Sequence, residues 1–476
     1  MSIAFPDPDP AILARREAIL AGLSRLVAPE ALVTSEDERR AFETDGLTAY
    51  RRLPLAVVLP SSTAEVAAVL AFCNREGVKV VPRGAGTSLA GGAIPQEDAI
   101  VLGVSKMTRV LSVDFENRTA RVEAGITNLA ISAAVSHEGF FYAPDPSSQL
   151  ACTIAGNIAM NSGGAHCLKY GVTTNNLLGV TLALLDGTVV ELGGDHLDSA
   201  GLDLLGLVVG SEGQIGIVTE ATVRILRAAE GARPVLLGFP SAERAGECVA
   251  AIIADGLVPV ALEYMDRLAI RITEDFSKAG YPDVEAMLIV EVEGSDQEID
   301  EQLRRIVGLA RRFGVEAVRV SNSEAESTAI WKGRKSAFGA TGRVSDYICM
   351  DGTIPTGQLP HVLRRIDEIV AAEGLKVANV FHAGDGNLHP LVMFDINAPG
   401  EMEKAERAGE EILKLCVEVG GCLTGEHGVG IEKRDLMRRQ YGEADLDQQM
   451  RVRNVFDPNW LLNPAKVFPL DGRPAA

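Results

Sequence analysis

Three of the seven histidines lie in two short glycine-rich motifs whose residue types suit metal or acid–base chemistry. VFHAGDGNLHP holds His382 and His389, and TGEHGVG holds Glu426 and His427. The Gly-Asp-Gly-Asn core of the first motif predicts a turn between two strands, across which its histidines can meet. Two histidines and a carboxylate are a donor set for Zn, Mn or Fe. Alternatively, these histidines are turn and core residues that hydrogen-bond the backbone, since His-x6-His is no standard metal signature.

Glycine is in excess, at 48 of 476 residues or about 10% against a usual ~7%, and it is clustered. The first cluster, PRGAGTSLAGG, spans residues 82–92. Its backbone N–H groups are unobstructed by side chains, which suits a pyrophosphate. It is neither a Rossmann fingerprint, because Leu89 stands at the third glycine position, nor a P-loop, because no Lys-Ser/Thr follows Gly91. The alternative is a simple tight turn.

Two further clusters of small residues follow. PDPSS (144–148) precedes TIAGNIAMNSGG (153–164), and GSEGQIGIVT covers 210–219. Small residues at this density let the backbone approach a large, flat ligand closely.

A cationic segment, IWKGRKSAF (330–338), stands out in an acidic chain. Lys and Arg number 45 and Asp and Glu 65, so the net charge is 45 − 65 = −20. An acidic enzyme that acts on an anion needs a local cation, and the fork of Arg334 suits a carboxylate. The alternative is a solvated helix face.

Together these motifs resemble the FAD-binding domain of the vanillyl-alcohol-oxidase type of flavoprotein, and the later segments resemble its FAD-linked oxidase C-terminal half. Within that superfamily the chain resembles the D-2-hydroxy-acid dehydrogenases, above all the large flavin subunits of bacterial glycolate oxidases. The resemblance covers roughly residues 40–470 and rests on five separated motifs in the same order.

The resemblance implies FAD, with its pyrophosphate on residues 83–88 and its isoalloxazine near 145–164 and Glu212. The flavin is expected to be non-covalent, because Thr87 stands where members with covalent flavin often have His. The residues expected to bind FAD are Pro82, Arg83, Gly84, Ala85, Gly86, Thr87, Ser88, Pro144, Asp145, Ser147, Ser148, Thr153, Gly156, Asn157, Asn161, Ser162, Gly163, Gly164, Tyr170, Glu212, Gly213, Gly216, Ile217, Val218 and Asn463.

The resemblance also implies roles for the histidine motifs. His382, His389 and Glu426 match the ligands of a divalent metal, Zn or Mn, and His427 matches the catalytic base. Arg334 matches an arginine that contacts the substrate.

Three positions depart from relatives that act on dicarboxylates. Those relatives tend to carry Thr, Lys and Asn where this chain has Phe338, Cys349 and Leu391. The departures remove polar groups that would bind a second carboxylate, so a small 2-hydroxy monocarboxylate is the expected substrate.

We therefore expect flavin-dependent oxidation of glycolate or D-lactate to the 2-oxo acid, with hydride passing to FAD and electrons to a partner or quinone. The alternatives are a D-2-hydroxyglutarate-type dehydrogenase, a flavin-binding subunit active only in a complex, and a metal hydrolase with structural glycine clusters. The 2-hydroxy acid, the metal, the electron acceptor and the oligomeric state stay open at this point.

The expected fold is α+β, with a two-part FAD-binding domain and an antiparallel-sheet substrate domain. We expect an N-terminal helical cap over 1–54, the FAD-binding domain over 55–230, a substrate and metal domain over 231–430, and C-terminal helices returning to the FAD domain over 431–476. Strands alternating with amphipathic helices over 233–375 predict a sheet covered by helices on one face.

Charge and cysteine content limit the partners. The acidic balance argues against nucleic-acid binding. Seven scattered cysteines without a C-x-x-C pair indicate reduced thiols and exclude an iron–sulfur cluster bound by this chain alone. With no secretory signal, a cytoplasmic location is expected, peripheral at the inner membrane only through partners. The resemblance implies a second flavin subunit and an iron–sulfur subunit as those partners.

Overall fold

The computed structural model describes residues 3–196 and 201–471, which divide into two compact units. The N-terminal unit consists of residues 3–163, 171–228 and 427–471, and the sheet unit consists of 164–170 and 229–426. The ends of the predicted ranges 1–54 and 431–476 lie outside the described residues. The chain therefore leaves the N-terminal unit and returns to it near its C-terminus.

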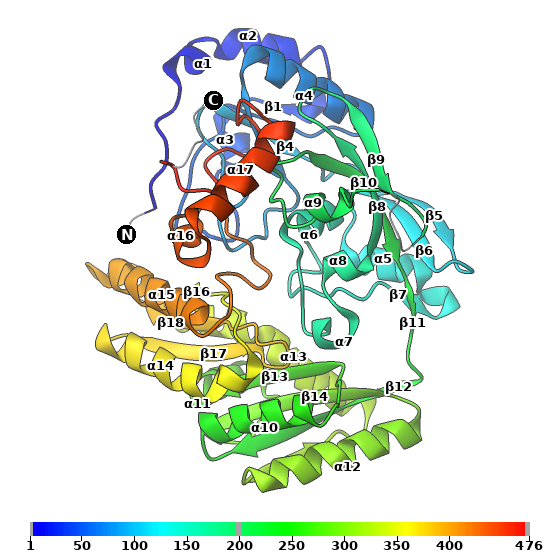
Figure 1. Ribbon diagram of the computed structural model, residues 1–476, viewed down its shortest axis with the longest axis vertical. Coiled ribbons are helices and arrows are strands. Elements are labelled where there is room, and N and C mark those ends of the chain that lie inside the picture. The colour runs from blue at the N-terminus through cyan, green and yellow to red at the C-terminus, as the bar shows by residue number, and fades with distance from the viewer. Residues whose placement is uncertain (1–2, 197–200, 472–476) are drawn as a thin grey trace. The chain divides into compact units, whose positions relative to one another are not determined.

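The N-terminal unit contains a four-stranded and a five-stranded sheet (Figure 1). The first has the order β1-β2-β4-β3, with β4 parallel to both β2 and β3. The second is antiparallel, in the order β5-β6-β10-β8-β9, and β7 pairs separately with β11. The strands are β1 (Leu32–Val33), β2 (Ala56–Val58), β3 (Lys79–Arg83), β4 (Ala99–Gly103), β5 (Val110–Asp114), β6 (Thr119–Glu123), β7 (Phe140–Phe141), β8 (Leu177–Ala183), β9 (Val189–Gly193), β10 (Ile217–Arg224) and β11 (Leu226–Arg227).

Local sequence signals set the helix ends in this unit. In α4 (Thr63–Glu76), the helix before the first glycine loop, the Ser62 side chain caps the N-terminus by accepting a hydrogen bond from the amide of Glu65. Gly77 ends the same helix at φ +69°. Both are residue types that favour helix ends in the sequence itself. The helices are α1 (Pro10–Ala14), α2 (Arg16–Leu23), α3 (Glu36–Arg39), α4 (Thr63–Glu76), α5 (Asn128–Val135), α6 (Ile154–Met160), α8 (Thr173–Asn176), α9 (Leu205–Val208), α16 (Met437–Gln440) and α17 (Glu443–Phe456).

The sheet unit is built on seven antiparallel strands in the order β15-β12-β14-β13-β17-β18-β16. Its strands are β12 (Gly231–Phe239), β13 (Ala261–Asp266), β14 (Ala286–Gly294), β15 (Ala317–Val320), β16 (Asp346–Cys349), β17 (Lys376–His382) and β18 (Pro390–Phe394). Its helices are α7 (Cys167–Tyr170), α10 (Ala242–Ala254), α11 (Arg267–Ser277), α12 (Asp296–Arg312), α13 (Glu324–Gly342), α14 (Leu359–Ala372) and α15 (Glu401–Glu418).

Helices cover both faces of this sheet, so the prediction of one covered face was wrong (Figure 1). Met265 of β13 packs with α11 and α13, through residues such as Ile270 and Ile330. On the other side α10, α12 and α14 contact the strands. The sequence carries the signal, because the central strands are continuous apolar runs instead of alternating ones. Within the described ranges, no helix has the length and apolarity needed to cross a membrane.

Candidate functional site

The two histidines of the first motif meet across a turn, as their spacing predicted. β17 ends at His382, and β18 begins directly after His389. The two rings lie 5.2 Å apart, centroid to centroid, at an interplanar angle of 82°. Gly386 makes the turn possible: its φ is +75°, and a Cβ there would lie 2.1 Å from the carbonyl oxygen of Ile354.

Glu426 joins this pair through a loop held by Asp351. The Asp351 carboxylate accepts hydrogen bonds from the Thr424 hydroxyl at 2.5 Å and from the Glu426 amide at 3.2 Å. Glu426 Oε1 lies 3.3 Å from His389 Nε2 and 3.7 Å from His382 Nε2. One donor atom from each of the three residues lies within 4.8 Å of the others. The structure therefore gathers the predicted metal-ligand set.

Glu263, which sequence reasoning missed, connects this set to Arg334. It lies on β13 directly opposite His382 on β17. Its Oε1 is 2.7 Å from His382 Nδ1, and its Oε2 is 2.8 Å from Arg334 Nε and 2.6 Å from Nη2. The signal available in the sequence was a lone glutamate within the apolar strand ALEYM.

Mutual charge outweighs burial in this cluster. Burial alone would raise the pKa of Glu426, but the imidazoles of His382 and His389 lower it well below its ordinary value. Burial would lower the pKa of His382, but Glu263 and Glu426 raise it well above its ordinary value. Burial would also raise the pKa of Glu263, yet Arg334 and His382 bring it below the usual value. The carboxylates are thus held as anions beside the imidazole nitrogens.

The donor chemistry fits a divalent metal ion. Two imidazole nitrogens and a carboxylate oxygen suit Zn or Mn. The hydrogen bond from His382 Nδ1 to Glu263 directs Nε2 of the same ring towards Glu426. A carboxylate behind a ligating histidine is the usual outer-shell arrangement of such sites.

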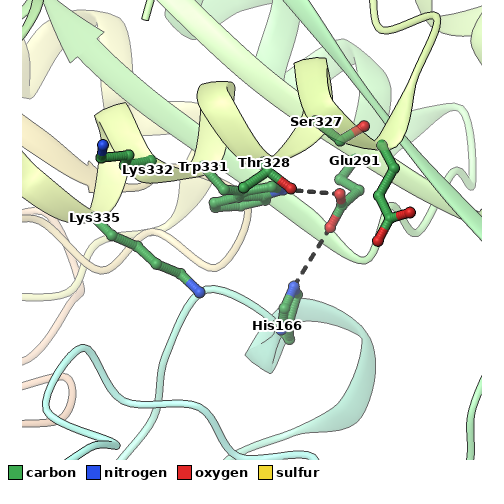
Figure 2. Close-up of a pocket in the computed structure, with 8 residues that line it drawn as sticks. His166, Glu291, Ser327, Thr328, Trp331, Lys332 and Lys335 are labelled. Carbon is green, nitrogen blue, oxygen red and sulfur yellow. Dashed lines mark hydrogen bonds and ion pairs between the residues drawn. The ribbon is translucent and has the colours of Figure 1, made fainter. Parts of the chain in front are cut away.

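The predicted cationic segment lies on helix α13, where its arginine is buried and its lysines are exposed. Arg334 is buried, with 5% of its surface exposed. Lys332 and Lys335 are exposed and line a cavity of about 430 Å³ together with Trp331 (Figure 2). The Trp331 Nε1 donates to Glu291 at 2.8 Å. The guanidinium therefore belongs to the buried cluster, whereas the lysines are surface residues.

In the N-terminal unit, the first glycine cluster lies against the second. A Cβ on Gly84 would stand 2.3 Å from the hydroxyl of Thr153, which caps α6 by accepting from the amide of Gly156. Gly86 has φ +76°, and a Cβ there would stand 2.1 Å from the Arg83 guanidinium. Arg83 folds beneath the loop and donates to the Thr44 carbonyl at 2.7 Å. Burial lowers its pKa.

Glu212 anchors the segment that follows His427. Its Oε1 accepts from the Val429 amide at 2.6 Å, and its Oε2 from the Gly430 amide at 2.8 Å. Burial raises the pKa of Glu212 despite these bonds. The proximity of Glu212 to the isoalloxazine stays a prediction; the structure shows that Glu212 holds the backbone just after His427.

Asn463 connects three parts of the N-terminal unit. Its Nδ2 donates to the carbonyls of Glu212 at 2.6 Å and Gly92 at 3.1 Å. Its backbone amide donates to the Val80 carbonyl at 2.7 Å. The C-terminal segment thus holds the first and third glycine clusters together.

The remaining predicted cofactor residues divide between the units. Gly164 and Tyr170 fall in the sheet unit, where the Tyr170 hydroxyl donates to Glu293. In the N-terminal unit, Asn161 ends α6 in the left-handed region at φ +52°. The others occupy the strand end and loop 82–88, the loop before α6, α6 itself, the loop after α6, the approach to β10 and the start of β10: Pro82, Ala85, Thr87, Ser88, Pro144, Asp145, Ser147, Ser148, Gly156, Asn157, Ser162, Gly163, Gly213, Gly216, Ile217 and Val218.

Comparison with known proteins identifies the family. Residues 54–193 match an FAD binding domain, and residues 229–467 match the C-terminal domain of FAD linked oxidases. The chain is 48% identical over 468 residues to glycolate oxidase subunit GlcD of Escherichia coli (strain K12), covering 98% of this chain and 93% of that protein. The chain belongs to the FAD-linked oxidases. It is an FAD-binding oxidoreductase.

Two further known proteins are similar over nine tenths of the chain or more. D-lactate dehydrogenase of Archaeoglobus fulgidus is 34% identical over 438 residues, covering 90% of this chain and 95% of that protein. A solved structure of p-cresol methylhydroxylase with substrate bound superimposes with a TM-score of 0.80 at 15% identity, covering 98% of each chain. That likeness shows the two-domain fold, which confirms the predicted fold class.

The N-terminal unit of this FAD-linked oxidase has a backbone that fits the cofactor. The amides of residues 84–88 donate to no described residue, so five consecutive backbone donors are available for a pyrophosphate. Gly84 and Gly86 leave two of these five positions without a side chain, and Gly86 adopts the left-handed conformation.

Proposed function

We propose that the chain oxidises a small D-2-hydroxy acid, glycolate or D-lactate, to the corresponding 2-oxo acid. The observation that carries this proposal is that an FAD-binding oxidoreductase contains the cluster of Glu263, Arg334, His382, His389 and Glu426, of which all but the partly buried Glu426 are buried. The names of two relatives, a glycolate oxidase subunit and a D-lactate dehydrogenase, support the substrate class.

Arg334 binds the substrate carboxylate in this proposal. A buried guanidinium offers that anion parallel hydrogen bonds. The residues around the site favour a monocarboxylate because they are apolar. The Phe338 ring lies 5.9 Å from the His389 ring, and Cys349 on β16 stands opposite Leu391 on β18, both within the apolar core. A second carboxylate would be buried without partners there, which argues against a dicarboxylate such as 2-hydroxyglutarate.

His382, His389 and Glu426 hold a divalent cation, Zn or Mn, which when bound supplies positive charge that lowers the pKa of the substrate hydroxyl. His427, the next residue in the chain after Glu426, takes the hydroxyl proton as general base. FAD is held non-covalently, because Thr87 stands where members with covalent flavin often have His. When bound, FAD supplies the acceptor to which the α-hydrogen of the substrate passes as a hydride. Arg334 keeps the carboxylate oriented throughout.

The reduced flavin passes its electrons to partner subunits. One relative is named as a subunit of glycolate oxidase, and the seven cysteines of this chain show no C-x-x-C pair for a cluster of its own. We infer a companion flavin subunit and an iron–sulfur subunit, through which the chain would reach a membrane quinone. The isolated chain should then reduce artificial dyes much faster than NAD or oxygen. Equal rates with either would remove the need for partners.

Anaerobic reduction of the bound flavin tests the proposed activity. Glycolate and D-lactate should bleach the flavin absorbance near roughly 450 nm, a property of the cofactor. L-Lactate and D-2-hydroxyglutarate serve as matched controls for configuration and for the second carboxylate. Bleaching by 2-hydroxyglutarate alone would overturn the monocarboxylate assignment, and no bleaching without added partners would favour a subunit active only in a complex.

A further inference from the structure

Glu263 contacts two proposed site residues at once. One carboxylate oxygen lies 2.7 Å from His382 Nδ1, and the other lies 2.8 Å from Arg334 Nε and 2.6 Å from Nη2. The side chain is fully buried, so water cannot replace either partner. The three residues come from β13, β17 and α13, and the register of β13 against β17 places Glu263 beside His382.

The contact with His382 decides which ring nitrogen is available. A carboxylate accepts, so in the neutral ring, the form that can bind a metal ion, the proton resides on Nδ1 and the lone pair on Nε2. Nε2 is the atom that faces Glu426, at 3.7 Å from its Oε1. Without an acceptor at Nδ1, the ring would lose both its tautomer preference and its fixed orientation.

The contact with Arg334 uses one edge of the guanidinium. Nε and Nη2 both face Oε2 of Glu263. No described residue accepts a hydrogen bond from Nη1. The buried arginine therefore has one edge fixed by protein and keeps donors for a second anion.

We propose that Glu263 is a positioning residue that sets the His382 tautomer and the Arg334 orientation together, linking the metal ligand to the residue that binds the substrate carboxylate. This inference rests on the proposed function for the substrate half, whereas the metal half concerns only the chain and its cation. Loss of the Glu263 carboxylate should therefore change both metal binding, through His382, and substrate binding, through Arg334.

Glu263→Gln tests the proposal, because Glu263 uses one oxygen for His382 and the other for Arg334, and glutamine replaces one of these acceptors with an NH₂ group that can only donate. We expect Zn²⁺ and Mn²⁺ to bind about 10–100-fold more weakly, the usual effect of removing an outer-shell partner, measured by competition with a chromogenic chelator. NMR of ¹⁵N-histidine, recorded on the metal-free protein at a pH where the His382 ring is neutral, should show His382 losing its preference for the Nδ1–H tautomer. The KM for the 2-hydroxy acid should rise as well.

Glu291→Gln is the matched control. Glu291 is a buried glutamate on the neighbouring strand β14, it accepts from Trp331, and it contacts none of the five cluster residues in the hydrogen bonds described. Its metal affinity and its His382 signals should equal those of the wild type, whereas the signals of His166, whose Nε2 lies 3.5 Å from Glu291, can shift. Wild-type metal affinity and an unchanged His382 spectrum in a folded Glu263→Gln variant would overturn the proposal, as would an equal loss in Glu291→Gln.

A second variant covers the case in which Glu263→Gln fails to fold. Glu263→Leu with Arg334→Met replaces the buried ion pair with apolar side chains of similar size, a change that proteins often tolerate. The positive charge of Arg334 repels a cation, so its removal can only strengthen Zn²⁺ binding. Weaker Zn²⁺ binding in this variant must therefore come from the loss of Glu263. Wild-type affinity in this variant would also overturn the proposal.

The two proposals fail in distinguishable ways. If no 2-hydroxy acid reduces the wild-type flavin, the proposed function fails, whereas metal affinity and the histidine spectrum still judge the role of Glu263. If the wild type is active but these two readouts do not move, only the role of Glu263 fails.

Discussion

At the scale of single residues, the cluster in the sheet unit has an uneven balance of charge. The carboxylates of Glu263, Asp351 and Glu426 surround two imidazoles and one guanidinium. A buried carboxylate needs a cation or several hydrogen-bond donors to offset its lost hydration. Asp351 has its donors in Thr424 and the Glu426 amide, and Glu263 has Arg334. Glu426 faces the two histidines, which is where a divalent ion would complete the balance.

His427→Asn should lower the turnover number by about 10²–10⁴, the usual contribution of a general base. FAD content should stay unchanged, because Glu212 accepts hydrogen bonds from the backbone amides of Val429 and Gly430 and not from the His427 side chain. Steady-state kinetics and the flavin spectrum check this. His361→Asn, on an exposed histidine of α14, is the control. A wild-type rate in a flavin-loaded His427→Asn enzyme would contradict the assignment.

Lys466 gives a prediction for stability against pH. Burial lowers the pKa of this lysine to about 7, and its Nζ donates to the neutral oxygens of Asn463 and Pro464. The unfolded chain, with an ordinary lysine pKa near 10.5, binds more protons between pH 7 and 10. Stability should therefore rise with pH in that window, by at most about 1.4 kcal/mol per pH unit.

Lys466→Met should abolish this rise, because the variant has no proton to release there. Urea unfolding at pH 7, 8, 9 and 10 under reducing conditions measures it. Lys106→Met, on an exposed lysine, should keep the wild-type slope. An unchanged slope in Lys466→Met would show that another group causes the rise.

The residue types of the site could be predicted, but most of the pairings could not. The meeting of His382 and His389 follows from a local turn, so their motif predicted it, whereas their grouping with Glu426 was implied by the family resemblance. Glu263 lies 119 residues from His382, and only the register of β13 against β17 makes them neighbours. Tyr170 shows the opposite case: a residue close in sequence to the flavin motifs bonds to Glu293 of the sheet unit.

At the scale of elements, the loop 82–88 depends on the absence of side chains. Gly84→Ala would place a methyl group 2.3 Å from the Thr153 hydroxyl, which would push the loop away from α6. FAD affinity should fall while the sheet unit keeps its metal affinity. Fluorescence titration of the flavin-free protein with FAD gives the measurement.

Gly308→Ala is the control for that substitution, since its added methyl group on α12 would meet nothing within 4 Å. It should leave FAD affinity unchanged and favour the helix slightly. Equal FAD affinity in the Gly84→Ala and Gly308→Ala variants would show that the loop does not need its close approach to Thr153.

Elements whose ends carry strong local signals can be predicted from the sequence. The arrangement of helices on the two faces of the sheet was predicted wrongly. Ser62 and Gly77 mark both ends of α4, and the Gly-Asp-Gly-Asn sequence marks the turn between β17 and β18. The number of covered sheet faces depends on partners distant in sequence, such as Ile330 of α13 against Met265 of β13. Periodicity alone therefore showed that strands and helices alternate, but not on which side each helix packs.

At the scale of the whole molecule, the proposed metal ligands and the glycine loops belong to different compact units. Removing the metal should therefore abolish activity without releasing FAD. Chelation followed by elemental analysis, with the flavin spectrum recorded alongside, checks this, and His389→Ala should reproduce the chelated state. Activity after verified metal removal would leave Arg334 and His427 as the groups that orient the substrate.

The discontinuous N-terminal unit has a consequence for how the protein is made. Val80 donates its amide to the carbonyl of Leu461, and Asn463 bonds to Gly92 and Glu212. A ribosome delivers residues 461–463 only after the whole sheet unit has been synthesised. The sheet unit can therefore fold during synthesis, whereas the glycine loops gain these contacts only later. Flavin capture thus becomes a checkpoint that a chain passes only once the segment around residues 461–463 has been made.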